Sequence, residues 1–211
     1  MPKLSSPIEM KIITKLRGSR ATLGQFFTSA RVSSDVYYSR KVGYFLQVLS
    51  FVPRVLDGQG RRRPPSEFKT IRLHDQAQAF AALGCLNSNL FYWFITVYSD
   101  CRHLNRREVE TFPINLLALA SGPVGNEIQG LASALMDDIE KNSQDRIMRF
   151  SHDTLTVQNI IPKHSKPIID QIDGVLAEHY GFNDEELDFI VNYDIKFRMG
   201  RDAASDDEPA A

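Results

Sequence analysis

The sequence predicts an α+β fold in which an irregular, aromatic-rich sheet packs on a long helix and a mainly helical C-terminal part follows. Three observations lead to this prediction. The first half holds short segments rich in aromatic and β-branched residues, the apolar residues after Asp75 follow helical spacing, and the second half carries repeated helix-capping signals. With 211 residues and 43% hydrophobic composition, the chain is long enough to bury a substantial core.

The first half alternates helical, strand-like and turn segments. Ser6-Pro7 begins a short amphipathic helix. Val36–Tyr38 and Tyr44–Val52 are strand-like because they are rich in aromatic and β-branched residues. Asp57-Gly58-Gln59-Gly60 predicts a turn, and Phe68–Leu73 predicts a strand that returns from it.

One long helix is expected after these strands. Asp75 is suited to cap a helix that runs through Tyr98, because its apolar positions follow helical spacing; they are Ala79, Leu83, Leu86, Leu90, Phe94 and Val97. A loop is expected over Ser99–Arg107, and Phe112-Pro113 ends the unit.

The second half predicts three further helices and one strand. A helix is expected over Asn126–Lys141 and a strand over Leu155–Ile161. Lys166-Pro167 begins a helix that ends at Tyr180, before Gly181. Asn183 and Glu186 form a capping-box pattern for a last helix, expected to reach about Met199.

Charge is distributed unevenly along the chain. Residues 1–112 hold 17 Lys/Arg and 8 Asp/Glu, a balance of +9, whereas residues 113–211 hold 8 and 18, a balance of −10. Such asymmetry favours a nucleic-acid surface in the basic half, although a dipolar domain whose charges only solvate it has the same pattern. We therefore divide the chain into a basic domain at 1–113, a helical part at 114–201 and a disordered acidic tail at 202–211.

Several function classes are disfavoured. Two cysteines, Cys85 and Cys101, make no disulfide framework, and no apolar run approaches the ~20 residues of a membrane span, so we expect a cytoplasmic protein without a membrane partner. The sequence contains no phosphate-binding loop and no dinucleotide-binding motif. Cys85, Cys101 and His103 are too few and too irregularly spaced for a zinc site, so neither a metal nor a catalytic residue is predicted.

DNA binding explains the basic half better. Cations and aromatic residues alternate around the predicted strands, an arginine run follows the turn, and a compact polar group follows the long helix; the candidates are Tyr38, Arg40, Lys41, Tyr44, Arg61, Arg62, Arg63, Ser99, Asp100, Arg102, His103, Asn105, Arg106 and Arg107. Lysine and arginine contact phosphates, whereas arginine and asparagine also read base edges. Two structural alternatives stay open. Arg106 and Arg107 also suit a helix start neutralised by Glu108 and Glu110, and the tyrosines also suit cross-strand packing.

Three nearby runs resemble one known family. Leu86–Phe94, Ser99–Val109 and Phe112–Ile114 resemble the TaqI-like C-terminal specificity region of bacterial adenine-specific restriction–modification DNA methyltransferases, of the type IIG kind. Ile169–Arg201 is similar to the C-terminal ending of the same proteins, and Pro2–Ile8 to an internal segment of them. The resemblance therefore extends over nearly the whole chain.

The resemblance implies a target-recognition module that grips double-stranded DNA while a catalytic domain flips out an adenine and methylates its N6 atom. The family's Asn-Pro-Pro-Tyr or Phe signature is missing, as is any S-adenosylmethionine loop, so we expect no cofactor in this chain and no methylation by it alone. A separate methyltransferase or nuclease subunit would be its partner. The alternative is an interaction module or truncated remnant that docks on such a subunit without DNA contact, through exposed aromatic residues such as Tyr92 and Trp93.

Overall fold

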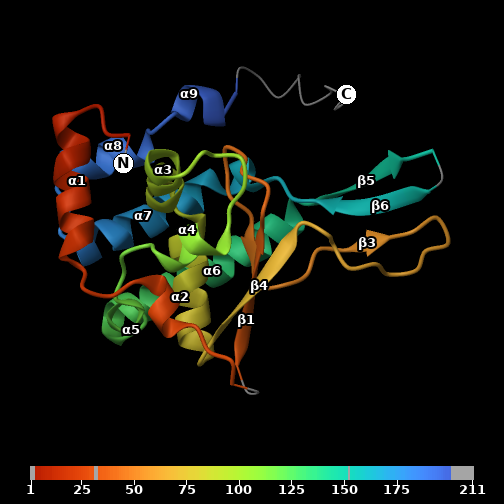
Figure 1. The fold of residues 1–211 in the computed structure, drawn as a ribbon, viewed down its shortest axis with the longest axis horizontal. Helices are drawn as coiled ribbons and strands as arrows, with labels where there is room; N and C mark the ends of the chain where they lie inside the picture. Colours follow the sequence, from red (N-terminus) through yellow and green to blue (C-terminus); the bar gives the residue numbers. More distant parts are fainter. Residues whose placement is uncertain (1–2, 31–32, 152, 201–211) are drawn as a thin grey trace.

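The computed structural model describes residues 3–30, 33–151 and 153–200. It confirms a mixed α+β fold with a helical C-terminal part (Figure 1). The strands form two antiparallel three-stranded sheets, in the orders β2-β1-β4 and β3-β6-β5. Their bounds are β1 Ser34–Ser39, β2 Val48–Leu49, β3 Val55–Leu56, β4 Phe68–Leu73, β5 Gln144–Arg149 and β6 Thr154–Asn159.

Helices lie to one side of β1 and β4 and fill most of the molecule (Figure 1). The α-helices are α1 Pro7–Gly18, α2 Gln76–Asn87, α3 Asn89–Tyr98, α4 Arg106–Glu110, α5 Leu116–Leu119, α6 Gly122–Lys141, α7 Lys166–Tyr180, α8 Asp184–Val191 and α9 Ile195–Arg198. Two short 3-10 helices, η1 Leu23–Phe26 and η2 Pro162–Ser165, connect them. The predicted starts of α1, α7 and α8 are confirmed, since α1 and α8 follow Ser6 and Asn183 and α7 begins at Lys166-Pro167.

The first sheet packs on α2, as the sequence predicts. Val36 and Tyr38 of β1 and Ile71 and Leu73 of β4 are buried, and β1, β2 and β4 all contact α2. Helices α6 and α7 pack against α2 as well. Burial of one helix between a sheet and two helices explains why α2 is apolar on all sides rather than on one stripe.

The prediction of a single long helix is wrong. It is divided at Ser88 into α2 and α3, which meet at a bend of 63°. The Ser88 hydroxyl donates to the Cys85 carbonyl (2.6 Å) and accepts from the Phe91 backbone N–H (3.0 Å), so this residue ends one helix and caps the next. The expected strand Tyr44–Val52 is also largely wrong, because only β2 within it is extended.

Three further differences concern the helices and the second sheet. The last helix ends at Val191, and a left-handed Asp194 (φ 54°) separates it from α9. Residues 106–110 form α4 where a loop was expected to reach Arg107. Strands β3 and β5 were not predicted, and the tail at 202–211 lies outside the described residues.

One core cluster draws on residues from Ile12 to Ile190, and β3 pairs with β6 across the boundary drawn at 113. The domain division stays a prediction. Trp93 and Tyr92 are 0% and 6% exposed, so their assignment as surface aromatics is wrong. Within the described ranges, no helix alone has both the length and the apolar composition to cross a membrane; α2 and α3 pass only as a bent pair.

Candidate nucleic-acid interface

Two basic segments that lie far apart in the sequence meet on one surface. Lys41 forms an antiparallel bridge with His103, and the Leu104 backbone N–H donates to the Arg40 carbonyl at 2.8 Å. Leu104 is 1% exposed and anchors this contact in the core. We call Arg40, Lys41, Arg102, His103 and Asn105 the junction surface. Arg40 is half-buried and the other four are exposed.

The cations of the junction surface are available to a ligand. Arg40, Lys41 and Arg102 form no salt bridge within the parts of the chain that the structure describes. Arg40 is held in place through its backbone, since its N–H donates to the Glu67 carbonyl at 2.8 Å. Among the described residues, the guanidinium and ammonium groups therefore have no carboxylate partner, while their backbone is fixed at both segments.

The turn before the junction is built by local hydrogen bonds. Ser99 is 7% exposed, and its hydroxyl accepts from the Cys101 N–H at 3.0 Å. The Asp100 carboxylate accepts from the Arg102 N–H at 3.1 Å, and Cys101 adopts a positive φ of 59°. Ser99 and Asp100 thus shape the loop that presents Arg102, which accounts for these two residue types without any contact to DNA.

The next candidates, Asn105, Arg106 and Arg107, lie at the start of helix α4. The Asn105 N–H donates to the Glu108 carboxylate at 3.0 Å at the start of the helix. Arg106 pairs with Glu110 at 2.6 Å and lies over the Phe27 ring, 5.6 Å from its centroid. The helix-start alternative therefore describes Arg106 in this fold. The side chain of Arg107 lines a separate cavity of about 380 Å³ beside α1 and α3.

The two tyrosine candidates have opposite environments. Tyr38 is 2% exposed within the core, and burial raises the pKa of its hydroxyl. Its packing leaves no side-chain access to DNA, as the cross-strand alternative proposes. Tyr44 is 53% exposed and lies on the wall of a groove described below.

The arginine run lies on the second sheet and not at the junction. Asp57, whose side chain is 1% exposed, holds Arg61 at 2.9 Å and Arg63 at 3.4 Å. Arg62 forms a bridge with Leu56 and is exposed. Figure 1 shows β3 and its loop beside β5 and β6 at the right, away from α4. Two of the three arginines therefore stabilise their own loop.

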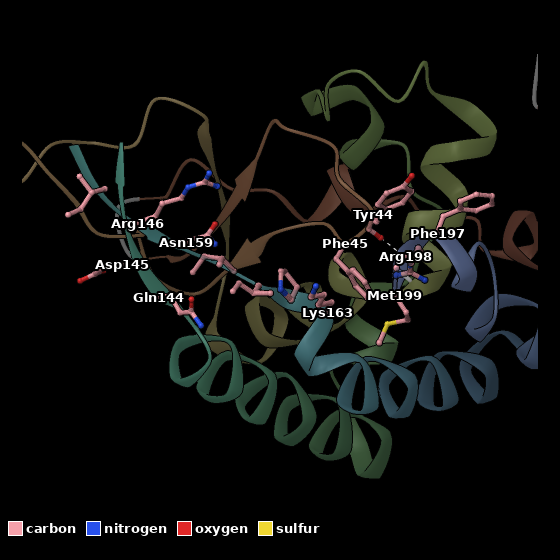
Figure 2. A pocket seen from close by; sticks show the side chains of 15 residues that line it. Tyr44, Phe45, Gln144, Asp145, Arg146, Asn159, Lys163, Phe197, Arg198 and Met199 are labelled. Atoms are coloured by element: carbon pink, nitrogen blue, oxygen red, sulfur yellow. Dashed lines mark hydrogen bonds between the residues drawn. The ribbon is translucent and has the colours of Figure 1, made fainter. Parts of the chain in front are cut away.

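A groove of about 900 Å³ lies between the β5–β6 hairpin and α9 (Figure 2). We call it the hairpin groove. Its walls carry amide, cationic and apolar side chains, among them Tyr44, Gln144, Arg146, Asn159, Lys163 and Phe197. Of these six residues, Tyr44 was a candidate; the other five lie in the half of the chain that has an acidic total and were not candidates. Residues 141–166 nevertheless hold five Lys/Arg against two Asp/Glu, and this local excess could have indicated them.

A buried arginine fixes one wall of the groove. Arg198 is 3% exposed and lies between the rings of Phe45 and Tyr92, 4.3 Å and 4.5 Å from their centroids. It donates to the Tyr44 carbonyl at 2.8 Å and to the Asn89 side chain. Burial lowers the pKa of Arg198, and nearby acidic groups oppose this shift. Helix α9 is thereby attached to the Tyr44–Phe45 segment.

Comparisons with family models, with curated proteins and with solved structures find no match for this chain. Function therefore rests on the sites themselves. Among the described residues, no group of three or more His, Cys, Asp or Glu side chains is placed to hold a metal ion. Cys85 is fully buried, and burial raises the pKa of its thiol, which makes it a poor nucleophile.

Proposed function

We propose that this chain is a DNA-binding specificity module of an adenine-N6 methyltransferase system, and that the junction surface is its DNA contact. One observation carries the proposal: the Lys41–His103 bridge joins two basic segments into one surface whose cations form no salt bridge with the described residues. The family resemblance of 86–114 includes one of those two segments.

The residues of this surface have different roles in the proposal. Lys41, Arg40 and Arg102 contact phosphates, which gives affinity and position without sequence information. His103 and Asn105 come soon after Arg102 in the same loop and contact base edges. An asparagine amide is suited to hydrogen-bond an adenine base. Arg62 adds a phosphate contact from the second sheet, because it is the exposed member of the arginine run that does not hold Asp57.

Phosphate contacts are tested by the salt dependence of binding. Replacing both Lys41 and Arg102 by alanine should weaken binding to every duplex and lower the slope of log K against log salt by about 2. Lys11→Ala, which removes an exposed cation from α1, is the matched control and should leave the slope unchanged. If wild-type protein binds a random duplex library in low salt no better than a neutral control protein, the proposal fails.

Base contacts are tested by sequence preference. Asn105→Ser keeps a residue that caps α4 but removes the amide, so stability should change little. After selection from a randomised duplex library, this variant and His103→Ala should each lose about 1–3 kcal/mol of discrimination while non-specific affinity stays near that of wild type. Loss of affinity on all sequences alike would contradict a role in base reading.

Catalysis belongs to another chain in this proposal. A separate methyltransferase subunit in the cytoplasm supplies the S-adenosylmethionine site and the adenine pocket, and this chain supplies double-stranded DNA recognition. The purified chain should transfer no labelled methyl group from S-adenosylmethionine to duplex DNA, and methyl transfer by it would overturn this assignment. Recovery of a catalytic subunit with no contribution to its DNA footprint would favour a docking role instead.

A further inference from the structure

Strand β5 is an uncovered sheet edge. It is the outer strand of the β3-β6-β5 sheet, and all six of its residues are exposed. Figure 1 shows the β5–β6 hairpin projecting from the body of the molecule. The opposite edge differs, because the chain at 61–63 folds over β3, with Arg63 N–H donating to the Val55 carbonyl at 2.9 Å. An uncovered edge presents unpaired backbone donors and acceptors to another strand.

The hairpin register determines which residues of β5 offer those groups. The Phe150 N–H donates to the Asp153 carbonyl at 2.8 Å, so position 150 hydrogen-bonds to the partner side of the hairpin. Hydrogen bonding alternates along an antiparallel strand. The backbone groups of Asp145, Ile147 and Arg149 therefore point away from β6. The hairpin also exposes large apolar side chains, with Ile147 at 63% and Phe150 at 54%.

We propose that a second copy of this chain pairs with β5 in an antiparallel arrangement, about a two-fold axis at Ile147. Ile147 then lies opposite itself, and Asp145 lies opposite Arg149 of the second copy. All three positions have outward backbone groups, so the ladder is complete. One carboxylate oxygen of Asp145 already pairs with Arg54 of its own chain at 2.7 Å, which leaves the other oxygen for Arg149 of the second copy on the same face of the sheet. Symmetry makes that pair twice.

Other registers suit this strand less well. An axis at Met148 places Ile147 opposite Arg149 of the second copy and makes no ion pair. An axis between Ile147 and Met148 places a residue whose backbone groups point outward opposite one whose backbone groups already bond to β6. It also places Arg146 opposite Arg149 of the second copy, and these like charges repel. Charge and hydrogen bonding therefore select the register centred on Ile147.

The same register covers apolar surface at both ends of the ladder. It places Phe150 of the second copy opposite Gln144, which lines the hairpin groove. The groove also carries exposed Tyr44, Phe197 and Met199. Two three-stranded sheets become one continuous sheet, and the edge is closed by symmetry. This inference does not rest on DNA binding.

Sedimentation equilibrium without DNA tests the pairing, at protein concentrations from about 1 µM to about 1 mM. Wild type should show a monomer–dimer equilibrium. Arg149→Asp should raise the dimer dissociation constant about tenfold or more, because both ion pairs become repulsive. Arg146→Asp makes the same charge change on the same strand but lies opposite Met148 of the second copy, so the constant should stay within about threefold.

Mixing two defective variants gives an independent test that a folding defect does not imitate. Asp145→Arg should also be monomeric, yet an equal mixture with Arg149→Asp should form heterodimers, since each cation then faces a carboxylate. The proposal would be overturned if wild type stayed monomeric at every concentration. That would hold even if the monomer bound duplex DNA or a catalytic subunit in its hairpin groove. Absence of the heterodimer, or equal weakening by Arg146→Asp and Arg149→Asp, would overturn it as well.

Cross-linking tests the register directly. In a Cys101→Ser background, Ile147→Cys places two thiols on the axis, where opposed Cα atoms of a hydrogen-bonded pair lie about 5.5 Å apart, within disulfide range. Cys85 is buried and does not compete. Ile147→Cys should form covalent dimer faster than Met148→Cys, and the reverse order would refute this register.

Discussion

Removing the carboxylate of Asp173 should cost much of the stability of this fold. Asp173 lies on α7 at 2% exposure and accepts three hydrogen bonds at the start of α3: from Asn89 N–H (3.1 Å), the Asn89 side-chain amide (2.6 Å) and Leu90 N–H (3.0 Å). Asp173→Ala leaves the backbone N–H groups of Asn89 and Leu90 without acceptors, at about 1–3 kcal/mol each, and removes one of the two acceptors of the Asn89 amide, which still donates to Asp170 at 2.9 Å. Because such losses do not add fully and the desolvation cost of the carboxylate disappears, we expect a net loss of about 3–5 kcal/mol.

Urea unfolding at about pH 5, below the raised pKa of Asp173, measures this loss, followed by far-UV circular dichroism and by the fluorescence of Trp93, the single and fully buried tryptophan. Glu178→Ala is the matched control, because it removes an exposed carboxylate from the same helix and should change stability by less than about 0.5 kcal/mol. A loss below about 1 kcal/mol in Asp173→Ala would show that the carboxylate does not hold the α2–α3 bend together.

Three further predictions concern pH, helix glycines and the helix break. Burial raises the pKa of Asp173 to about 7 from its ordinary 3.8, so its contribution is complete below about pH 4 and is lost as pH rises through 7; in urea unfolding, the advantage of wild type over Asp173→Asn should fall by up to ~1.4 kcal/mol per pH unit in that window. In α6, Gly130→Ala meets open space and should stabilise by about 0.5–1 kcal/mol, whereas a Cβ at Gly125 would lie 2.4 Å from the Ala120 carbonyl and should destabilise; thermal unfolding of the pair should show opposite signs. Ser88→Ala removes the cap of α3 and should cost about 1 kcal/mol in the same assay, while an unchanged midpoint would contradict the capping role.

Elements with local signals were predictable from the sequence. Ser6 and Glu9 form the capping box of α1, and Asn183 and Glu186 form that of α8. Gly181 ends α7 in the left-handed conformation that glycine adopts readily (φ 68°). Each of these signals needs only residues within one turn of the helix end, so no knowledge of the tertiary structure was required.

Features that depend on distant partners were not predictable. The break at Ser88 is stabilised by Asp173, 85 positions later in the chain, whereas the apolar spacing continues through it. Strand β5 is exposed on both faces, so its sequence lacks the alternation that a half-buried strand shows. The junction surface exists only because the Lys41–His103 bridge joins two segments that are distant in the sequence. The excess of basic residues in the β5–β6 hairpin is not visible when charge is summed over the acidic second half.

The two proposed surfaces are separable by mutation, because the junction surface and β5 share no residue. The Lys41/Arg102 double variant should dimerise like wild type. Arg149→Asp should keep wild-type affinity for a single selected DNA site but lose any preference for two such sites arranged as an inverted repeat, since a two-fold dimer matches a two-fold sequence. If Arg149→Asp weakens binding to a single site as much as to the repeat, the hairpin itself contacts DNA, and β5 and the junction surface belong to one interface.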